Sequence, residues 1–440
     1  MKKIMIILVA FVLLFTITGC NVNETPTIEK EEVSLIDIEG LTLVDAIVAL
    51  NGDLNINPVY VETNASLPGK VLSYGAGLKV GDKVEKGMTI DVKVAAKPQN
   101  AVSYDSRIDY ISEVSKLTGP DSSLNSEVLL SGGIYGTDLG IPVSVNDKMI
   151  FLFGDSFSGA NMKGLWNSNF IAVSEDNTYW DGLAFKELIT NENGMVRPFA
   201  QGKHENGNET DRNVEVTKIP TGGITIGEYT YVFYMSIRYW GPSGCWNVNY
   251  NQCIRSKDLS NWENVPSLCF TEEEAPNFAQ IYPMEDPNSD YIYLYGIEGG
   301  RNGGACLARV TKEQFTNRNE YEYLVASNTW VKGDNGLAML KNDSYWVIGA
   351  PVSELSVCYN EYLGQYMTVF SRNGKLIMLT APTPYDIFKD PVVLLSQQDY
   401  SGIYGGFIHP RYLTDGGKSF YMTVSSWAVY NVYWVKVVLK

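Results

Sequence analysis

Short apolar runs separated by polar turns recur from Asp121 to Lys440 and dominate the chain. Each run spans only a few residues, as at 148–153 and 229–237, and is followed by a turn rich in Gly, Asn and Asp. Runs of this length with such turns are typical of β-strands, and no long helical pattern interrupts them. A repeated order of hairpin and further strands divides the region into about five units. The pattern therefore predicts a mainly β domain over 121–440, folded as a five-bladed β-propeller, with a pair of β-sandwiches as the alternative.

A shorter N-terminal region, residues 35–97, follows a different pattern. The segment 41–50 places apolar residues at helical spacing, with Thr42 in position to cap its start and Asn51-Gly52 in position to end it. Three segments rich in β-forming residues follow, at 55–62, 69–74 and 88–95. These features predict a small α+β domain in the order αβββ.

Residues 98–120 connect the two regions and carry no motif that points to chemistry. We predict that they form a linker with a short helix at 108–117. The large β domain is accordingly expected to begin at residue 121.

The start of the chain has the pattern of an export signal. Two lysines precede an apolar run from Ile4 to Ile17, which is too short to be preferred as a membrane span of about 20 residues. The run ends in Ile17-Thr18-Gly19-Cys20, which resembles the lipobox of bacterial lipoproteins, where the cysteine is acylated and becomes the first residue after cleavage. The resemblance implies a signal peptide over 1–19, a lipid anchor at Cys20, an acidic tether over 20–34 and a position on the outer face of the bacterial cell membrane. The alternative is an ordinary signal peptide cleaved nearby, with Cys20 incidental.

Composition and charge narrow the classes of function. With 45% hydrophobic and 12% aromatic residues, the chain is neither a disordered polymer, a coiled coil nor a collagen-like fibre. Its 50 acidic and 34 basic residues leave a net charge of −16, and no dense run of Lys or Arg offers a surface for nucleic acid. Two histidines and six cysteines without a CxxC pair do not make a zinc site. A cation with oxygen ligands in the channel of a propeller is the alternative, but no Asp-rich loop indicates its ligands, so we expect that no metal or other cofactor is required.

The N-terminal α+β region resembles the PASTA module of bacterial cell-wall proteins. The resemblance rests on GLTLVDAIVAL (40–50), PGKVLSYGAGLKVGDKVEKG (68–87) and MTIDVKVAA (88–96), which occur in the order of the module. It departs from the module at Tyr74-Gly75-Ala76-Gly77, where a Gln-x-Pro often stands. The resemblance implies contact with peptidoglycan, and the alternative is a rigid spacer between the lipid and the large domain.

Two acidic residues interrupt apolar stretches near the start of the large domain. Asp138 precedes a predicted strand, and Asp155 emerges at the end of the next strand, directly after Gly154. A glycine there lets the backbone approach another group closely, and a hairpin can return both carboxylates to one end of the sheet. Glycoside hydrolysis uses such a pair, because a protonated carboxyl protonates the leaving oxygen while an ionised one activates water or attacks the anomeric carbon. Either aspartate taken alone is more often a turn residue.

The region from residue 121 onward resembles the domain-of-unknown-function family 4185. The motifs that carry the resemblance occur in one order along the chain: Gly136-Thr137-Asp138-Leu139-Gly140, Phe153-Gly154-Asp155-Ser156-Phe157, Trp166-Asn167-Ser168-Asn169, Ile219-Pro220-Thr221-Gly222-Gly223, Met235-Ser236-Ile237-Arg238-Tyr239-Trp240-Gly241, Ser256-Lys257-Asp258 with Trp262, Leu307-Ala308-Arg309-Val310, Tyr362-Leu363-Gly364-Gln365-Tyr366 and Tyr404-Gly405-Gly406-Phe407. The characterised relatives are endo-D-arabinanases of glycoside hydrolase family 183 with a five-bladed propeller. The resemblance thus implies that fold, Asp138 and Asp155 as the catalytic pair, and inverting hydrolysis of furanoside linkages.

Several further residues are candidates for binding a sugar or assisting the pair. Tryptophans stack on the C–H faces of sugars, while Arg, Asn and His donate to hydroxyls. The candidates for substrate binding are Trp166, Asn169, Arg238, Trp240, Trp246, Asn249, Arg301 and His409. Glu215 and Glu354 are candidates for a third acid. Each tryptophan also has the alternative of a core position, which is common in β domains.

Two classes of function fit these observations. The first is a lipid-anchored, cell-surface glycoside hydrolase of the endo-arabinanase type, acting on a cell-wall or environmental polysaccharide. The second is a propeller that binds or scaffolds glycan at the cell wall without cleaving it. Polysaccharide, peptidoglycan and the membrane are therefore the expected partners, and nucleic acid is not.

Overall fold

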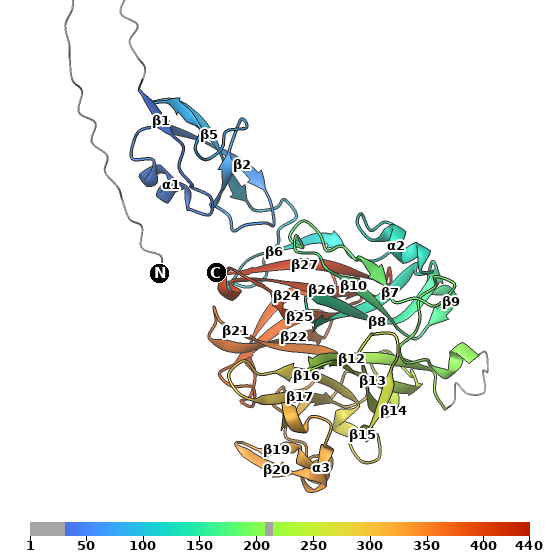
Figure 1. The fold of residues 1–440 in the computed structure, drawn as a ribbon. Coiled ribbons are helices and arrows are strands. Elements are labelled where there is room, and N and C mark those ends of the chain that lie inside the picture. Colours follow the sequence, from blue (N-terminus) through green and yellow to red (C-terminus); the bar gives the residue numbers. More distant parts are fainter. Residues whose placement is uncertain (1–30, 207–213) are drawn as a thin grey trace, which may run out of the picture. The chain divides into compact units, whose positions relative to one another are not determined.

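The computed structural model describes residues 31–206 and 214–440. The chain divides into two compact units (Figure 1). One comprises the described residues up to Val61 together with Gly69–Ala95, and the other comprises Glu62–Pro68 together with Ala96–Lys440. The predicted signal peptide, the lipidation site Cys20 and most of the acidic tether lie outside the described residues. Within the described part of the chain, no helix is long and apolar enough to cross a membrane.

The small unit has the predicted αβββ order with two additional short strands. Its elements are β1 (Glu32–Ser34), α1 (Leu43–Ala49), β2 (Asn55–Glu62), β3 (Val71–Tyr74), β4 (Lys83–Glu85) and β5 (Thr89–Ala96). The strands form an antiparallel pair, β1-β4, and a three-stranded sheet in the order β2-β5-β3. Thr42 caps α1 as the sequence predicts, because its side-chain oxygen accepts a 3.1 Å hydrogen bond from the Asp45 backbone N–H.

The large unit is built from five antiparallel sheets, which confirms a mainly β domain. The first sheet holds β7 (Gly136–Val145), β8 (Lys148–Gly159), β9 (Lys163–Asn167), β10 (Phe170–Ser174) and β11 (Glu187–Leu188), and the second holds β12 (Thr217–Ile226), β13 (Tyr229–Tyr239), β14 (Asn247–Ser256) and β15 (Glu263–Thr271). The third holds β16 (Gln280–Glu285), β17 (Tyr291–Ile297), β18 (Ala305–Thr311), β19 (Glu322–Ala326) and β20 (Thr329–Lys332). The fourth holds β21 (Leu355–Asn360), β22 (Gln365–Arg372), β23 (Lys375–Ala381) and β24 (Lys389–Ser396). The fifth holds β25 (Ile403–Thr414), β26 (Ser419–Ser426), β27 (Asn431–Leu439) and β6 (Ile108–Lys116), and the α-helices are α2 (Ser126–Ser131) and α3 (Gly333–Asn342).

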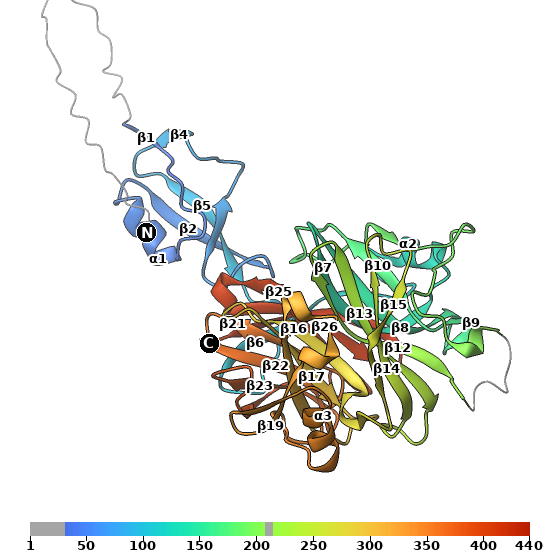
Figure 2. The same cartoon turned by 60° about the horizontal axis from the view of Figure 1, so that its bottom comes forward.

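The first strands of the five sheets contact one another in a cycle. In sequence order, β7 contacts β12, β12 contacts β16, β16 contacts β21, and β21 contacts β25. The cycle is completed by β25, which contacts β7, so the red C-terminal strands lie beside the teal first sheet in Figures 1 and 2. The starting ends of these inner strands therefore lie around a common centre.

Residues 108–116 are a strand, which corrects the predicted helix at 108–117. The strand β6 pairs antiparallel with the C-terminal strand β27 and forms the outer edge of the fifth sheet. Ile108 and Ile111 are buried in the core of that sheet. The pairing partner comes from the other end of the chain, so a pattern read locally does not reveal it. The whole predicted linker, residues 98–120, therefore belongs to the large unit, which begins before residue 121.

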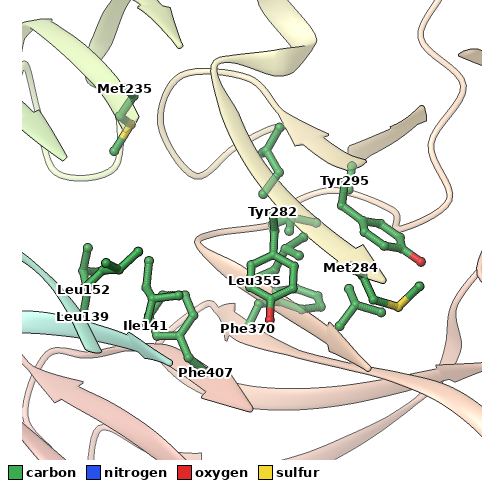
Figure 3. Close-up of a cluster of buried hydrophobic side chains, with 14 of the residues drawn as sticks. Leu139, Ile141, Leu152, Met235, Tyr282, Met284, Tyr295, Leu355, Phe370 and Phe407 are labelled. Atoms are coloured by element: carbon green, nitrogen blue, oxygen red, sulfur yellow. The ribbon is translucent and has the colours of Figure 1, made fainter. Parts of the chain in front are cut away.

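Apolar side chains fill the centre between the inner strands. Ile141, Tyr282, Leu355 and Phe407 meet there (Figure 3), and only about 10 Å³ of free space remains between them. A separate cavity of about 500 Å³ opens where the inner strands end. The packed centre thus isolates the groups at the starts of the inner strands from those at their ends.

Candidate active site

Asp138 is placed by an irregularity at the start of β7. The pairing of β7 with β8 shifts register between Thr137 and Leu139 and again between Leu139 and Ile141. Leu139 has a positive φ of 69°, and its backbone N–H donates to the hydroxyl of Ser425 in the fifth sheet. Bulges of this kind redirect the neighbouring side chain and are frequent next to active sites. The irregular start of β7 therefore sets the direction of Asp138.

The Asp138 carboxyl lies among aromatic and charged groups from other sheets. Its Oδ2 accepts a 2.8 Å hydrogen bond from the hydroxyl of Tyr404, at the start of β25. Its Oδ1 is buried and has no hydrogen-bond partner among the described residues. Burial raises the pKa of Asp138 to about 7, and the negative charge of Glu354 adds to the effect, while Tyr404 and Arg301 oppose it. Asp138 therefore keeps its proton to an unusually high pH for an aspartate.

Gly154 is the residue that makes room for this carboxyl. A Cβ added at Gly154 would collide with Asp138 Oδ1 and would lie 3.2 Å from the side chain of Leu139. The sequence predicts a close approach at this glycine, and the group that approaches is the candidate catalytic acid itself.

Asp155 is the next residue of β8 after Gly154, and 6% of its surface is exposed. Its Oδ1 accepts a 2.6 Å hydrogen bond from the hydroxyl of Thr217, the first residue of β12. Burial raises the pKa of Tyr430, and the nearby charges of Asp138 and Asp155 raise it further. The structure thus brings the predicted pair to the same end of the first sheet, beside the start of the second.

Arg301 and Glu354 extend the site across the third and fourth sheets. The guanidinium makes two hydrogen bonds to the carboxylate, 2.8 Å from Nη2 to Oε1 and 3.1 Å from Nε to Oε2. The same guanidinium lies 4.8 Å from the ring centre of Tyr404 and 5.2 Å from that of Trp246. Of the two candidates for a third acid, Glu354 is therefore the one that acts on Asp138. It does so as one half of an ion pair.

Aromatic side chains flank this end of the sheets. Trp246 is buried against Arg301, and Trp240 packs edge-on against it with 37% of its surface exposed. Trp166 stacks between two other rings, Phe157 at 5.7 Å and His204 at 3.7 Å. These three predicted tryptophans therefore lie in ring clusters around the site.

Besides Thr217, which holds Asp155, three residues described here at the site were not predicted from the sequence. Tyr404 and Tyr430 contact Asp138, and Trp427, with 55% of its surface exposed, packs edge-on against Tyr430. Tyr404 belongs to the motif Tyr404-Gly405-Gly406-Phe407, so the sequence contained a signal for it without indicating a role. Tyr430 and Trp427 lie in the turn between β26 and β27, and no local pattern marks them.

Two asparagines that were predicted to bind substrate instead form hydrogen bonds within the protein, mainly to its backbone. The Asn169 carboxamide donates to the carbonyls of Ala200 and Lys218 and accepts from the N–H groups of Phe199 and Ala200, which uses its hydrogen-bonding capacity. Asn249 donates to the Val214 carbonyl and the Ser236 hydroxyl.

The remaining candidates lie apart from Asp138. Arg238 forms an exposed ion pair with Glu272. His409 lines the cavity of about 500 Å³ at the opposite ends of the inner strands, and burial, with the charge of Arg411, lowers its pKa to about 4. Glu215 is bound by Ser236, Tyr250 and Lys218 in the second sheet. His409 thus lies at the far ends of the inner strands, whereas the Glu215 carboxylate and the Arg238 guanidinium are held by other side chains.

Among residues 31–206 and 214–440, no cluster of three His, Cys, Asp or Glu side chains could hold an ion. The five cysteines in this part of the chain are free thiols, and three of them are buried.

The sequence profile of the family described as "Domain of unknown function (DUF4185)" matches residues 127–436. The chain belongs to the DUF4185 family. The match covers all five sheets except β6 and the last residues of β27, and it contains both aspartates.

Several known proteins are similar to this DUF4185 chain at low sequence identity. Notoamide biosynthesis cluster protein J of Aspergillus sp. (strain MF297-2) is 24% identical over 320 residues, which is 67% of this chain and 80% of that protein. A crystal structure of a proposed hydrolase from Bacteroides ovatus ATCC 8483 superposes with a TM-score of 0.55 at 13% identity, over 77% of this chain and 93% of that one. The arabinanase Arb43A of Bacillus subtilis matches with a TM-score of 0.39 at 12% identity, over 69% of this chain and 96% of that one.

Proposed function

We propose that this DUF4185 protein is a glycoside hydrolase whose five sheets are the blades of a propeller. It hydrolyses furanoside, arabinan-type linkages in a cell-wall or environmental polysaccharide. The observation that carries the proposal is the pairing of a carboxyl whose pKa is raised to about 7, Asp138, with a second aspartate, Asp155, at the same end of the first sheet. Two carboxyl groups in different environments are what acid and base roles in glycoside hydrolysis require.

The surroundings of each aspartate support a division of roles. Asp138 is the general acid, because it is still protonated near neutral pH and can give its proton to the leaving oxygen. Asp155 is the general base that activates a water, and its Oδ1 is held by the Thr217 hydroxyl. Tyr404 and the Arg301–Glu354 pair position Asp138 and adjust its pKa.

The decisive experiment measures release of reducing ends from a panel of arabinans and cell-wall polysaccharides. Wild type is expected to release them, and Asp138→Asn and Asp155→Asn are each expected to lose at least about a hundredfold in rate, because each removes one proton-transfer group. Asp334→Asn, an exposed carboxyl on α3, is the matched control and should retain wild-type activity. Full hydrolysis by either active-site variant contradicts the proposal.

A second function, glycan binding without cleavage, has its own support. Trp240 and Trp427 expose indole surface near Asp138, and such rings bind sugars whether or not hydrolysis follows. Retention of wild type on immobilised arabinan, with no release of reducing ends, would favour this alternative.

We also propose that the protein is lipid-anchored at Cys20 on the outer face of the cell membrane, with the small unit as a PASTA-like module at the cell wall. The support is the sequence Ile17-Thr18-Gly19-Cys20 and the αβββ order of the small unit. Metabolic labelling with a clickable fatty acid tests the anchor, since Cys20→Ser should abolish labelling. Peptidoglycan pull-down with and without residues 35–97 tests the module.

A further inference from the structure

Glu215 is a buried carboxylate that the proposed mechanism does not use. It is 4% exposed and lies just before β12. Its Oε2 accepts hydrogen bonds from the Ser236 hydroxyl at 2.6 Å and from the Tyr250 hydroxyl at 3.3 Å, and its Oε1 lies 3.7 Å from the Lys218 ammonium. A buried charge with this many dedicated partners orients them, and two of those partners, Tyr250 and Lys218, face a cavity.

This cavity has a volume of about 290 Å³ and lies between the second sheet and the segment Phe199-Ala200. Its wall includes side chains from all four strands of the sheet, among them Lys218, Tyr234, Gln252 and Asn264. Neither Asp138 nor Asp155 lines this cavity. The cavity is therefore separate from the candidate active site.

The polar groups of the cavity wall offer both donors and acceptors. The Gln252 amide nitrogen donates to the carbonyls of Cys253 and Val265, so its carbonyl oxygen is the part left for a ligand. The Tyr250 hydroxyl, which lines the cavity, donates to Glu215 and also interacts with the side chains of Tyr234 and Ser236. Lys218 supplies N–H donors, and Asn264 supplies both kinds of group at the exposed edge.

Aromatic rings form the apolar part of the same wall. Trp262 is held by a 2.9 Å hydrogen bond from its indole N–H to the Leu259 carbonyl and packs 5.8 Å from the ring of Phe199. The rings of Tyr234 and Tyr250 lie edge-on, 6.4 Å apart. Fixed rings beside oriented donors and acceptors are the combination that binds the C–H face and the hydroxyls of a sugar.

We infer that this cavity is a second carbohydrate-binding site, which accepts one uncharged sugar ring of a glycan and does not hydrolyse it. The charges at the wall balance, since Lys218 is paired with Glu215, so neither a phosphate nor an amine gains a net attraction. The volume lies just below the range of about 300 to 1,000 Å³ typical of pockets for larger ligands, which favours a single ring. The inference goes beyond the proposed function and shares with it only the class of ligand.

An NMR titration of the full chain with L-arabinose, D-arabinose and arabinotriose tests the site. The Asp138→Asn background prevents turnover of the oligosaccharide. We expect two classes of binding event, one of which weakens by about five- to tenfold in Tyr250→Phe, since one hydrogen bond is removed, and is lost in Asn264→Trp, which fills the mouth. Asn342→Ala, at the exposed end of α3, is the control and should bind as its parent does. Inorganic phosphate is the charged probe and should not compete.

The outcomes separate this site from the catalytic proposal. If wild type hydrolyses arabinan but Tyr250→Phe and Asn264→Trp titrate as the parent does, the second site is wrong and the hydrolase stands. If no polysaccharide is cleaved but the sugar signals still depend on residues 250 and 264, the hydrolase is wrong and the second site stands. An unfolded Asn264→Trp variant would also lose binding. The thermal unfolding curve of each variant is therefore measured, and the milder Tyr250→Phe is tested beside it. Competition by phosphate, or a single class of sites in every variant, overturns the inference.

Discussion

The hydroxyl of Tyr404 donates a 2.8 Å hydrogen bond to Oδ2 of Asp138, although the two residues are 266 positions apart in the sequence. Asp138 lies at the start of β7 and Tyr404 at the start of β25, so the bond joins the first sheet to the fifth. The contact between β25 and β7 that closes the cycle of inner strands also assembles the proposed acid. Closure of the domain and chemistry at its centre are therefore linked.

Removing this hydrogen bond should raise the pKa of Asp138 further. The hydroxyl of Tyr404 stabilises the ionised carboxylate, so Tyr404→Phe favours the protonated form. A hydrogen bond to a charged group contributes about 1.5 to 3 kcal/mol, which corresponds to a rise of about one to two pKa units. The alkaline limb of the pH profile of kcat/KM should move up by that amount. An unmoved limb would show that Tyr404 does not act on the acid.

Glu354→Gln should shift the same limb in the opposite direction. The charge of Glu354 raises the pKa of Asp138 while that of Arg301 lowers it, and the substitution removes the first and releases the second from its ion pair. The pKa of Asp138 should fall by about one unit. The measurement is again the pH profile of kcat/KM, with Asp334→Asn as the control. A rise in pKa would contradict the assigned role of the ion pair.

Gly154→Ala should impair catalysis far more than folding. The added Cβ meets Asp138 Oδ1, so the carboxyl must move away from its position beside Tyr404. A displacement of this size costs about a hundredfold in kcat, because proton transfer depends on exact placement. Gly349→Ala is the matched control, since no described atom lies within 4 Å of its added Cβ. Equal activity of the two variants would show that the close approach at Gly154 has no catalytic role.

Asp138→Asn should stabilise the protein at alkaline pH. The folded state raises the pKa of this carboxyl from 3.8 to about 7, so the folded protein binds the proton more tightly than the unfolded chain, and the free energy of unfolding falls as pH rises through that window. The loss of stability that results from ionising the buried carboxyl is complete above pH 7 and absent below about pH 4. An asparagine at this position does not ionise and so avoids the loss. We expect the variant to be more stable than wild type by about 4 kcal/mol at pH 8 and equally stable near pH 4, in urea unfolding followed by circular dichroism. A difference that is independent of pH would mean that the pKa is not raised.

Much of the local structure could be predicted because it depends on neighbours in the sequence. Thr42 caps α1 as expected, and the αβββ order of the small unit follows from turn residues and apolar spacing. Asp138 and Asp155 were predicted together because one hairpin, β7 and β8, carries both. The helix predicted at 108–117 was wrong because β6 obtains its hydrogen bonds from β27, more than 300 residues later in the chain.

Which of the other candidate residues lie near Asp138 could be seen only in the tertiary structure. The sequence offers Glu215 and Glu354 as equivalent third acids, but Arg301 joins only Glu354 to the surroundings of Asp138. His409 looked like a sugar ligand and lines the opposite end of the inner strands instead.

The sequence by itself indicated the hairpin strands of the large domain, their turns and the two aspartates, because hydrogen bonding within a hairpin and the burial of alternate side chains are local effects. The tertiary structure alone decided that Asp138 retains its proton, because burial and the charge of Glu354, which together outweigh the opposing effects of Tyr404 and Arg301, act on it only after the inner strands come together. A pKa depends on distances in space, and residues such as Tyr404, Arg301 and Glu354 come near Asp138 only through the closure of the domain.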